Sequence, residues 1–93
     1  MIDLDWAVGL VERNVGRYYR EWSREAKYRE LSDARMRFEV IEDGAPVAFA
    51  AFMFDTEPYK KASTRKVVYL YEIQVEPATQ GRGYGRRLME GVI

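Results

Sequence analysis

A glycine-rich turn between an apolar strand and a helix constrains the fold of this chain more than any other feature. The turn spans residues 80–85, Gln-Gly-Arg-Gly-Tyr-Gly, and it follows the apolar run at residues 66–75. Glycine adopts backbone angles that other residues avoid and lets the main chain approach a ligand closely. The N–H groups at the start of a helix favour a bound anion. The pattern therefore predicts a strand–loop–helix unit that binds a phosphate or a pyrophosphate, with a plain strand-to-helix connection as the alternative.

Two familiar phosphate-binding motifs do not fit this turn. A P-loop ends in Gly-Lys followed by Ser or Thr, which the turn lacks. A dinucleotide-binding fold needs an acidic residue about 20 positions further on, and the sequence ends before that position. A phosphate or pyrophosphate ligand that needs neither motif remains, and Arg82, Arg86 and Arg87 add positive charge around the turn.

The rest of the chain predicts an α/β (α+β) fold in the order helix, helix, three antiparallel strands, loop, helix. Apolar spacing of three and four predicts a helix over residues 3–20, and a charged helix follows over residues 21–31. Strands are expected at 36–42, 46–55 and 66–75, with a polar loop at 56–65 and a last helix from about residue 83. The second strand is almost wholly apolar, so we expect it to be central and covered on both faces. The charged helix is expected to be a solvated lid, or else a wall of a substrate groove.

Composition limits the chemistry that the chain can offer. Its 93 residues suit one small domain, and apolar and charged shares of 47% and 32% are typical of a folded one. The absence of cysteine and histidine excludes disulfides and thiolate metal sites and removes the commonest general base. A metal site is therefore not expected, and carboxylates and tyrosines are left for acid–base chemistry.

Charge and hydropathy also limit the expected partners. Lysine plus arginine equals aspartate plus glutamate at 15 each, and the basic residues do not gather on one face beyond the turn. Nucleic-acid binding is therefore not expected. No apolar run reaches the roughly 18 residues of a membrane span, so we expect an intracellular protein without a membrane partner.

Glu72 is the most informative charged residue, because it lies inside the otherwise apolar run 66–75. A carboxylate among apolar side chains is costly unless it is paired or functional. Strand alternation predicts that Glu72 shares a face with Leu70 and Gln74, opposite Tyr69 and Tyr71. We interpret Glu72 as a general base or an anchor for a substrate amine. The alternative is a strand-end glutamate that accepts a hydrogen bond from a backbone N–H or an arginine.

Asp55, Tyr69 and Tyr71 are the other candidates near the same rim. Asp55 ends the second predicted strand and would add a carboxylate beside Glu72, or else serve only as a turn residue. Tyr69 and Tyr71 would line the mouth of a pocket, or else pack in the core. A tyrosine hydroxyl at such a mouth could also protonate a departing thiolate.

The run Gln-x-x-Gly-x-Gly, with the strand before it, resembles the coenzyme A signature of the GNAT acetyltransferases. In that family the loop holds the pyrophosphate of acetyl-CoA and the strand bonds the pantetheine arm. The resemblance implies a partial GNAT fold that ends with the start of the coenzyme-binding helix. Further blocks are similar to the NatD-type N-alpha-acetyltransferase branch, which acetylates histone N-termini that begin Ser-Gly-Arg-Gly. These blocks are Trp6-Ala7, Trp22 and residues 24–33, 46–49, 52–55 and 69–75.

The resemblance assigns roles to individual residues. The pantetheine-binding strand would be Ile73, Gln74 and Val75. The pyrophosphate loop would be Gln80, Gly81, Arg82, Gly83, Tyr84 and Gly85. The groove for the peptide N-terminus would be Asp55, Tyr69, Tyr71 and Glu72, with Glu72 and Tyr71 catalytic. The resemblance also implies acetyl-CoA as co-substrate without a metal, a protein N-terminus such as that of a histone as acceptor, and a location in nucleus and cytoplasm.

Two residues depart from the family pattern. Phe38 stands where the family has a tyrosine on the first strand, so one contact to a substrate hydroxyl would be lost. Gln80 opens the loop where the branch has arginine, although glutamine is the commoner residue of the wider superfamily. The resemblance covers roughly half of a family domain, so residues 1–93 are expected to be the first part of a single truncated domain.

Three functions remain open from the sequence. The first is an acetyl-CoA-dependent N-alpha-acetyltransferase that acts on a protein N-terminus. The second is a GNAT enzyme that acetylates a lysine or a small amine. The third is an inactive fragment that only binds the coenzyme or a partner. Mapping the acetylated atom on peptides separates the first two, and coenzyme binding without turnover would identify the third.

Overall fold

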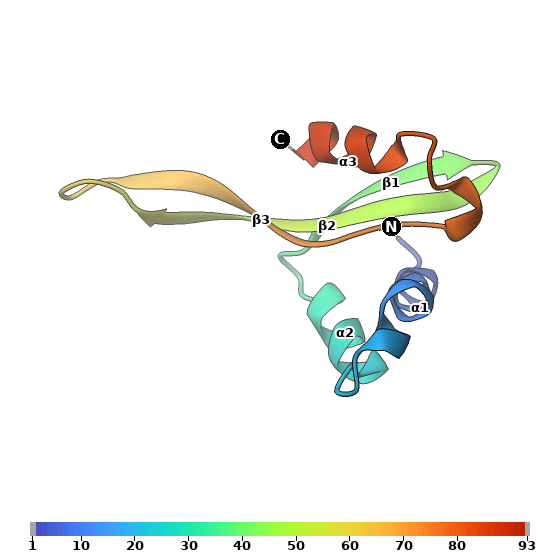
Figure 1. Ribbon diagram of the computed structural model, residues 1–93. Coiled ribbons are helices and arrows are strands. Elements are labelled where there is room, and N and C mark those ends of the chain that lie inside the picture. The colour runs from blue at the N-terminus through green and yellow to red at the C-terminus, as the bar shows by residue number, and fades with distance from the viewer. Residues whose placement is uncertain (1, 93) are drawn as a thin grey trace.

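The protein is a three-stranded antiparallel sheet with helices on both faces (Figure 1). Its structure, a computed structural model, describes residues 2–92. The elements in chain order are α1 (Leu4–Asn14), α2 (Arg24–Leu31), β1 (Arg37–Asp43), β2 (Ala45–Pro58), β3 (Thr64–Val75) and α3 (Tyr84–Val92), with short 3₁₀ turns η1 (Gly16–Tyr18) and η2 (Pro77–Thr79). The strands lie in the order β1-β2-β3, with α1 and α2 on one face and α3 on the other. This mixed α/β architecture confirms the predicted fold class.

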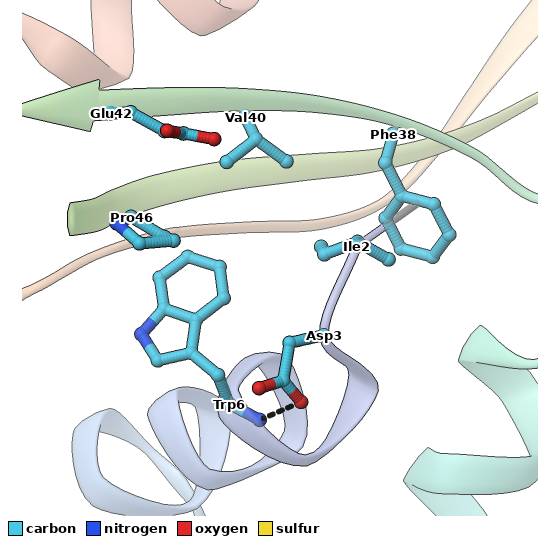
Figure 2. Close-up of a pocket in the computed structure, with 7 residues that line it drawn as sticks. All are labelled: Ile2, Asp3, Trp6, Phe38, Val40, Glu42 and Pro46. Atoms are coloured by element: carbon cyan, nitrogen blue, oxygen red, sulfur yellow. Dashed lines mark hydrogen bonds between the residues drawn. The ribbon is translucent and has the colours of Figure 1, made fainter.

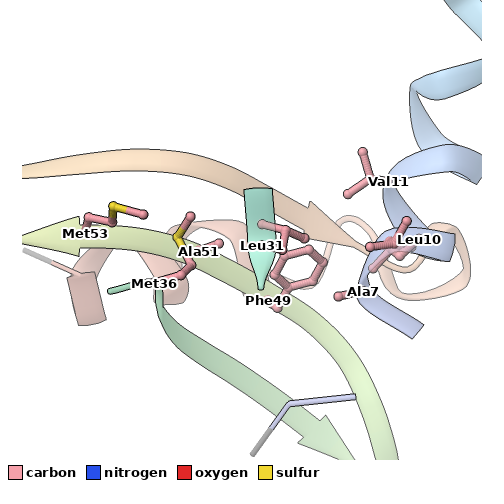
Figure 3. Packing of buried hydrophobic residues seen from close by; sticks show 9 residues of the cluster. Ala7, Leu10, Val11, Leu31, Met36, Phe49, Ala51 and Met53 are labelled. Atoms are coloured by element: carbon pink, nitrogen blue, oxygen red, sulfur yellow. The ribbon is translucent and has the colours of Figure 1, made fainter. Parts of the chain in front are cut away.

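The first part of β2 is buried because helices pack against both of its faces. Ala48, Phe49, Ala50 and Ala51 are fully buried, which confirms the prediction of a covered central strand for this part. Phe49 and Ala51 join a cluster with side chains of α1 and α2 (Figure 3). Ala48, Ala50 and Phe52 join a second cluster with α3. Successive side chains of β2 point to opposite faces of the sheet, so this one strand contributes to two separate hydrophobic clusters.

α1 is shorter than the sequence pattern predicts. Asp3 caps its start by accepting the backbone N–H of Trp6 at 3.2 Å. The helix ends at Asn14, so the prediction of a helix over residues 3–20 is wrong beyond that point. The reason is Gly16, which lies so close to the ring of Trp22 that an added Cβ would stand 2.9 Å from it. The chain continues as the short 3₁₀ turn η1, in which Gly16 is buried.

α2 begins at Arg24 rather than at residue 21. Ser23 caps it by accepting the backbone N–H of Ala26 at 3.1 Å. Only Leu31 of this helix is fully buried, but Lys27 is also turned inward, with 17% of its side chain exposed. α2 is therefore more than a solvated lid, because one of its charged residues faces the sheet.

β2 and β3 extend beyond the helices as a two-stranded ribbon (Figure 1). Residues 56–58 pair with residues 64–66, so the prediction of a loop over 56–65 is wrong except at its centre. The turn at 59–63 has two non-glycine residues at positive φ, Lys60 at 54° and Ala62 at 58°. An ion pair between Arg65 and Glu57 crosses the ribbon. We call residues 54–58 and 64–69 the outer ribbon, and residues 47–53 and 70–75 the inner hairpin.

Candidate active site

A β-bulge in β3 changes which face its side chains occupy. Ala51 lies opposite Glu72 while Phe52 lies opposite Leu70, which leaves Tyr71 as the extra residue. Directly opposed residues of antiparallel strands share a face. Glu72 therefore lies with Ala51 on the α1–α2 face, and Leu70 lies with Phe52 on the α3 face. The expectation that Glu72 and Leu70 share a face is wrong, since simple alternation fails at a bulge.

The bulge also brings Tyr69 to the face of Glu72. Tyr69 lies opposite Met53 and Gln74 lies opposite Phe49, and both partners belong to the α1–α2 cluster. The expectation that Tyr69 and Glu72 lie on opposite faces is therefore wrong as well. The predicted site residues divide between the faces, with Asp55, Tyr69, Glu72 and Gln74 on the α1–α2 face and Ile73, Val75 and Tyr84 packed against the α3 cluster.

Glu72 is held by two side-chain donors. The Lys27 ammonium of α2 lies 2.9 Å from Oε2 of Glu72, and the side-chain amide of Gln74 donates to Oε1 at 2.6 Å. Lys27 also contacts Glu30 at 2.8 Å, so one ammonium serves two carboxylates. The side chains of Lys27 and Glu72 are only 17% and 13% exposed, and charges at this depth need partners. The sequence suggested a backbone N–H or an arginine as the alternative partner of Glu72. The charged partner in the structure is a lysine from α2.

Lys27 keeps its positive charge at this site. Burial lowers the pKa of Lys27, but the hydrogen bonds and charges of Glu30 and Glu72 raise it by more, so the net shift is upward from the ordinary lysine value. The ammonium is therefore protonated throughout the neutral range. Sequence reasoning missed this residue, because its only signal was the i,i+3 spacing to Glu30, which is common on solvated helix faces.

Side chains at the end of α1 fasten the predicted pantetheine strand. Asn14 donates from Nδ2 to Oε1 of Gln74 at 2.9 Å and to the backbone oxygen of Val75 at 3.0 Å. Arg13 pairs with Glu76 at 2.9 Å just beyond the strand. Together with the contact between Gln74 and Glu72, these bonds form a polar chain from α1 across β3 to α2. Asn14 is a second residue that sequence reasoning missed.

Asp55 and Tyr71 lie near Arg35, which follows α2. The hydrogen bond and the charge of Asp33 raise the pKa of Arg35, and the nearby Tyr71 and Asp55 raise it further. Asp55 also accepts the backbone N–H of Thr56 at 2.7 Å. Tyr71 is 43% exposed, so it stands at the surface rather than in the core. Arg35 itself is paired with Asp33 at 3.2 Å, so its influence on Asp55 and Tyr71 is through charge and not through a direct contact.

The glycine loop has the geometry that an anion-binding turn needs. Gly81 and Gly83 have positive φ values of 86° and 80°, which favour glycine. No neighbouring atom lies within 4 Å of the place where a Cβ would stand at Gly81, Gly83 or Gly85, so the main chain is open to a ligand. The helical ladder of α3 begins with the N–H of Arg87 donating to the oxygen of Gly83 at 3.0 Å. The N–H groups before it have no partner within the helix, so the loop fits a pyrophosphate.

The arginines around this loop are held by other side chains. Arg82 lies 3.6 Å from a carboxylate oxygen of Asp43, the last residue of β1. Arg86 pairs at 3.3 Å with a glutamate one turn along α3. Arg87 lies over the ring of Tyr84, 5.9 Å from its centre. The positive charge of these arginines is therefore partly compensated. The hydrogen-bond donors that the loop offers to an anion are mainly its backbone N–H groups.

The part of the chain at residues 2–92 holds no group of three histidine, cysteine, aspartate or glutamate side chains that could bind a metal ion. It also holds no helix with the length and apolar character needed to cross a membrane. The candidate site offers carboxylates, tyrosine hydroxyls, side-chain amides, an ammonium and the backbone of the glycine loop.

Comparison with known proteins decides the family. The sequence model of the acetyltransferase (GNAT) family matches residues 4–93. The chain belongs to the GNAT family. This confirms the superfamily predicted from the glycine loop, and it agrees with the fold, in which the loop joins the sheet to α3.

Individual GNAT proteins resemble this chain to different degrees. N-alpha-acetyltransferase 40 of Saccharomyces cerevisiae is 32% identical over 105 residues, which are 94% of this chain and 36% of that protein. An acetyltransferase from Vibrio fischeri has a TM-score of 0.71 at 18% identity, over 97% of this chain and 75% of that one. The aminoglycoside N-acetyltransferase AAC(6')-Iy, solved with CoA, has a TM-score of 0.67 at 20% identity, over 96% and 59%. The chain thus spans about a third of the yeast relative, and the two structural likenesses show the fold alone.

Proposed function

We propose that this chain serves an acetyl-CoA-dependent N-alpha-acetyltransferase that acts on a protein N-terminus. The observation that carries the proposal is the placement of Glu72, a largely buried carboxylate that follows the bulge and directly precedes the predicted pantetheine strand, residues 73–75. A base at this point would stand where the thioester and the acceptor amine meet. The similarity to N-alpha-acetyltransferase 40 supports an α-amine as the acceptor.

The chemistry that Glu72 would serve is removal of a proton from the acceptor amine. An α-amine has a pKa of about 7.7–8.0, against about 10.4 for lysine, so a modest base suffices. A carboxylate offers about four acceptor positions, and Lys27 and Gln74 occupy one on each oxygen. A remaining position would take the amine proton, directly or through water. The amine nitrogen would then attack the thioester carbonyl, and the tetrahedral intermediate would collapse with cleavage of its C–S bond. Tyr71 would protonate the departing thiolate, and the resulting phenolate would take the second proton of the nitrogen as the amide forms.

The proposed acceptor is a histone-type N-terminus that begins Ser-Gly-Arg-Gly. Asp55 and Glu72 would attract the arginine of such a peptide through charge-assisted hydrogen bonds. The ion pair of Arg35 is with Asp33, at 3.2 Å, so the side chain of Asp55 would be open to a substrate arginine. A lysine or a small amine is the alternative acceptor, and binding of the coenzyme without turnover is the alternative to catalysis.

The coenzyme part of the proposal is tested by titrating acetyl-CoA into the chain by calorimetry. Gly83→Glu puts a carboxylate at the proposed pyrophosphate site and a side chain at a φ of 80°. Gly44→Glu is the matched control, since Gly44 has a φ of 74° and equally open surroundings in the β1–β2 turn. We expect micromolar binding by the wild type and by Gly44→Glu, and none by Gly83→Glu. A folded wild-type chain that binds no acetyl-CoA would contradict the coenzyme site and the function proposed for this chain.

The acceptor part is tested by mapping the product. A Ser-Gly-Arg-Gly peptide with an internal lysine is incubated with acetyl-CoA, and mass spectrometry locates the acetyl group; the same peptide with a blocked N-terminus is the control. We expect the acetyl group on the α-amine only. Glu72→Gln should lower kcat by about a hundred-fold or more without weakening coenzyme binding. Acetylated lysine would favour the alternative acceptor, and binding without any product would favour a binding-only role.

A further inference from the structure

A hollow lies beside the glycine loop, between the end of α1 and the end of β3. Its volume is about 390 Å³, and residues from α1, η1, β3 and the connection to the loop surround it. The polar residues and the proline that line it are Arg13, Asn14, Arg17, Gln74, Pro77 and Gln80. The proposed base, the proposed acceptor groove and the proposed coenzyme loop do not use the two arginines of this hollow.

The lining of this hollow is cationic. It contains two guanidinium groups and three side-chain amides, and no carboxylate is among its lining residues. A larger hollow of about 530 Å³, between the start of α1 and β1, has the opposite character (Figure 2). It is lined by apolar side chains and the carboxylates of Asp3 and Glu42. Guanidinium groups match phosphate oxygens with paired N–H donors, so the hollow at the end of α1 suits an anion and the other does not.

Arg17 is the arginine of this hollow whose charge is available. Arg13 is paired with Glu76 at 2.9 Å, so its charge is compensated. Arg17 instead donates to the hydroxyl of Tyr18 at 2.9 Å and lies 5.0 Å from the centre of that ring. A tyrosine ring holds a guanidinium in place without neutralising it. Arg17 can therefore direct its remaining N–H donors at an anion.

The hollow adjoins both segments that are proposed to hold the coenzyme. Gln74 belongs to the pantetheine strand, Gln80 opens the glycine loop, and both line the hollow. The backbone oxygen of Val75 accepts from Gln80 at 3.3 Å and from Asn14 at 3.0 Å, which fixes the loop and α1 to the same point. A coenzyme that follows residues 73–75 and turns at residues 81–85 would carry its phosphates past this rim. We propose that Arg17 binds a phosphate group of the coenzyme; the inference rests on the proposed function.

Calorimetry on the whole chain tests the inference with Arg17→Gln. Arg20→Gln is the matched control, because Arg20 is also exposed and does not line the hollow. We expect Arg17→Gln to weaken binding of coenzyme A about ten-fold and Arg20→Gln to bind like the wild type. Titrations with 3′-dephospho-coenzyme A and 4′-phosphopantetheine then identify the phosphate. The analogue with which Arg17→Gln and the wild type bind equally lacks the group that Arg17 holds. A loss that persists with both analogues assigns Arg17 to the phosphate attached to pantetheine, which both retain.

Each other outcome decides against the inference. Equal affinity of Arg17→Gln and the wild type for coenzyme A overturns it. An equal loss in Arg17→Gln and Arg20→Gln also overturns it, since that result would mean general charge attraction. In both cases, if Gly83→Glu fails to bind coenzyme A, the proposal that the glycine loop binds the coenzyme would still be supported. Failure of the folded wild type to bind coenzyme A overturns both proposals, and circular dichroism of each variant confirms that it is folded.

Discussion

The inner hairpin and the outer ribbon are halves of the same two strands, yet they are packed in opposite ways. Phe49 in the inner hairpin is fully buried, whereas Phe54 in the outer ribbon is 59% exposed. The backbone pairing is antiparallel in both halves. The difference is that the three helices lie over the inner hairpin only (Figure 1). Strand pairing therefore continues through both halves, while helix packing decides which half is buried.

The candidate site lies where the two halves meet. Glu72 belongs to the inner hairpin and is fixed by Lys27 and Gln74. Asp55 and Tyr69 belong to the outer ribbon and stay exposed. The proposed base is thus on the packed part of the sheet, and two of the proposed acceptor contacts, Asp55 and Tyr69, are on the part that a peptide can reach.

The largest effect should follow from Phe49→Ala. Phe49 packs against the ring of Trp6 at 5.6 Å between ring centres and against Phe38 at 6.4 Å. Removing its ring would leave a cavity in the α1–α2 cluster, so the free energy of unfolding should fall by about 3–5 kcal/mol. Urea denaturation followed by circular dichroism measures the loss. A variant that is already unfolded without urea would also agree with the prediction, because its loss would exceed the stability of the wild type. A loss below about 1 kcal/mol would contradict the view that helix packing on the inner hairpin holds the fold.

A smaller but distinct loss should follow from Lys27→Met. The variant leaves the largely buried carboxylate of Glu72 without its cation, at an expected cost of about 1–3 kcal/mol in unfolding free energy. Lys27→Arg restores the charge and should recover part of that loss. Lys60→Met is the matched control, because Lys60 is exposed in the turn of the outer ribbon. Equal stabilities of Lys27→Met and Lys60→Met would show that the ion pair adds nothing to the inner hairpin.

The same ion pair should make the inner hairpin sensitive to high pH. The folded-state pKa of Lys27 is raised, so its stabilisation is complete below the unfolded lysine pKa of about 10.4 and is lost as the pH rises through the folded-state pKa. Urea midpoints of the wild type and Lys27→Met are compared from about pH 8 upward. We expect the difference between the two proteins to shrink in the alkaline range. A difference that stays constant there would contradict the assignment.

The smallest effect should follow from Phe54→Ala in the outer ribbon. The ring centres of Phe54 and Phe52 are 5.5 Å apart, and the guanidinium carbon of Arg37 lies 5.7 Å from the ring centre of Phe54. Phe54 is nevertheless mostly exposed to solvent. The expected change in unfolding free energy is within about 0.5 kcal/mol. A loss above about 2 kcal/mol would mean that the outer ribbon is covered in solution. Repeating the measurement at about ten-fold lower protein concentration would then show whether a second copy covers it.

The fold could be predicted from the sequence where burial of a segment requires apolar residues. The apolar residues of β2 predicted a central strand because both of its faces are covered there. Residues 56–58 and 64–66 are mostly polar because the outer ribbon meets water on both faces, and polar composition suggested a loop. The end of α1 depends on the contact between Gly16 and Trp22, which helix periodicity does not record.

The site could be predicted in part for the same reason. Positive φ at Gly81 and Gly83 favours glycine, so the loop was visible in the sequence. The bulge at Tyr71 arises from the register between two strands, which the pattern of one strand does not contain. Lys27 lies 45 residues from Glu72, so only the tertiary structure reveals their pairing. The roles of the site residues remain predictions that the experiments above address.

The positions of Trp6 and Trp22 give the protein a built-in optical probe. They are its only tryptophans, and Trp6 packs on Phe49 while Trp22 packs on Gly16, both on the α1–α2 side of the sheet. α3 and the outer ribbon contain tyrosines but no tryptophan. Tryptophan emission therefore reports one layer of the molecule, whereas circular dichroism reports the whole backbone. If the two unfolding curves separate, with ellipticity lost first, the helix behind the glycine loop detaches before the layer beneath the sheet melts.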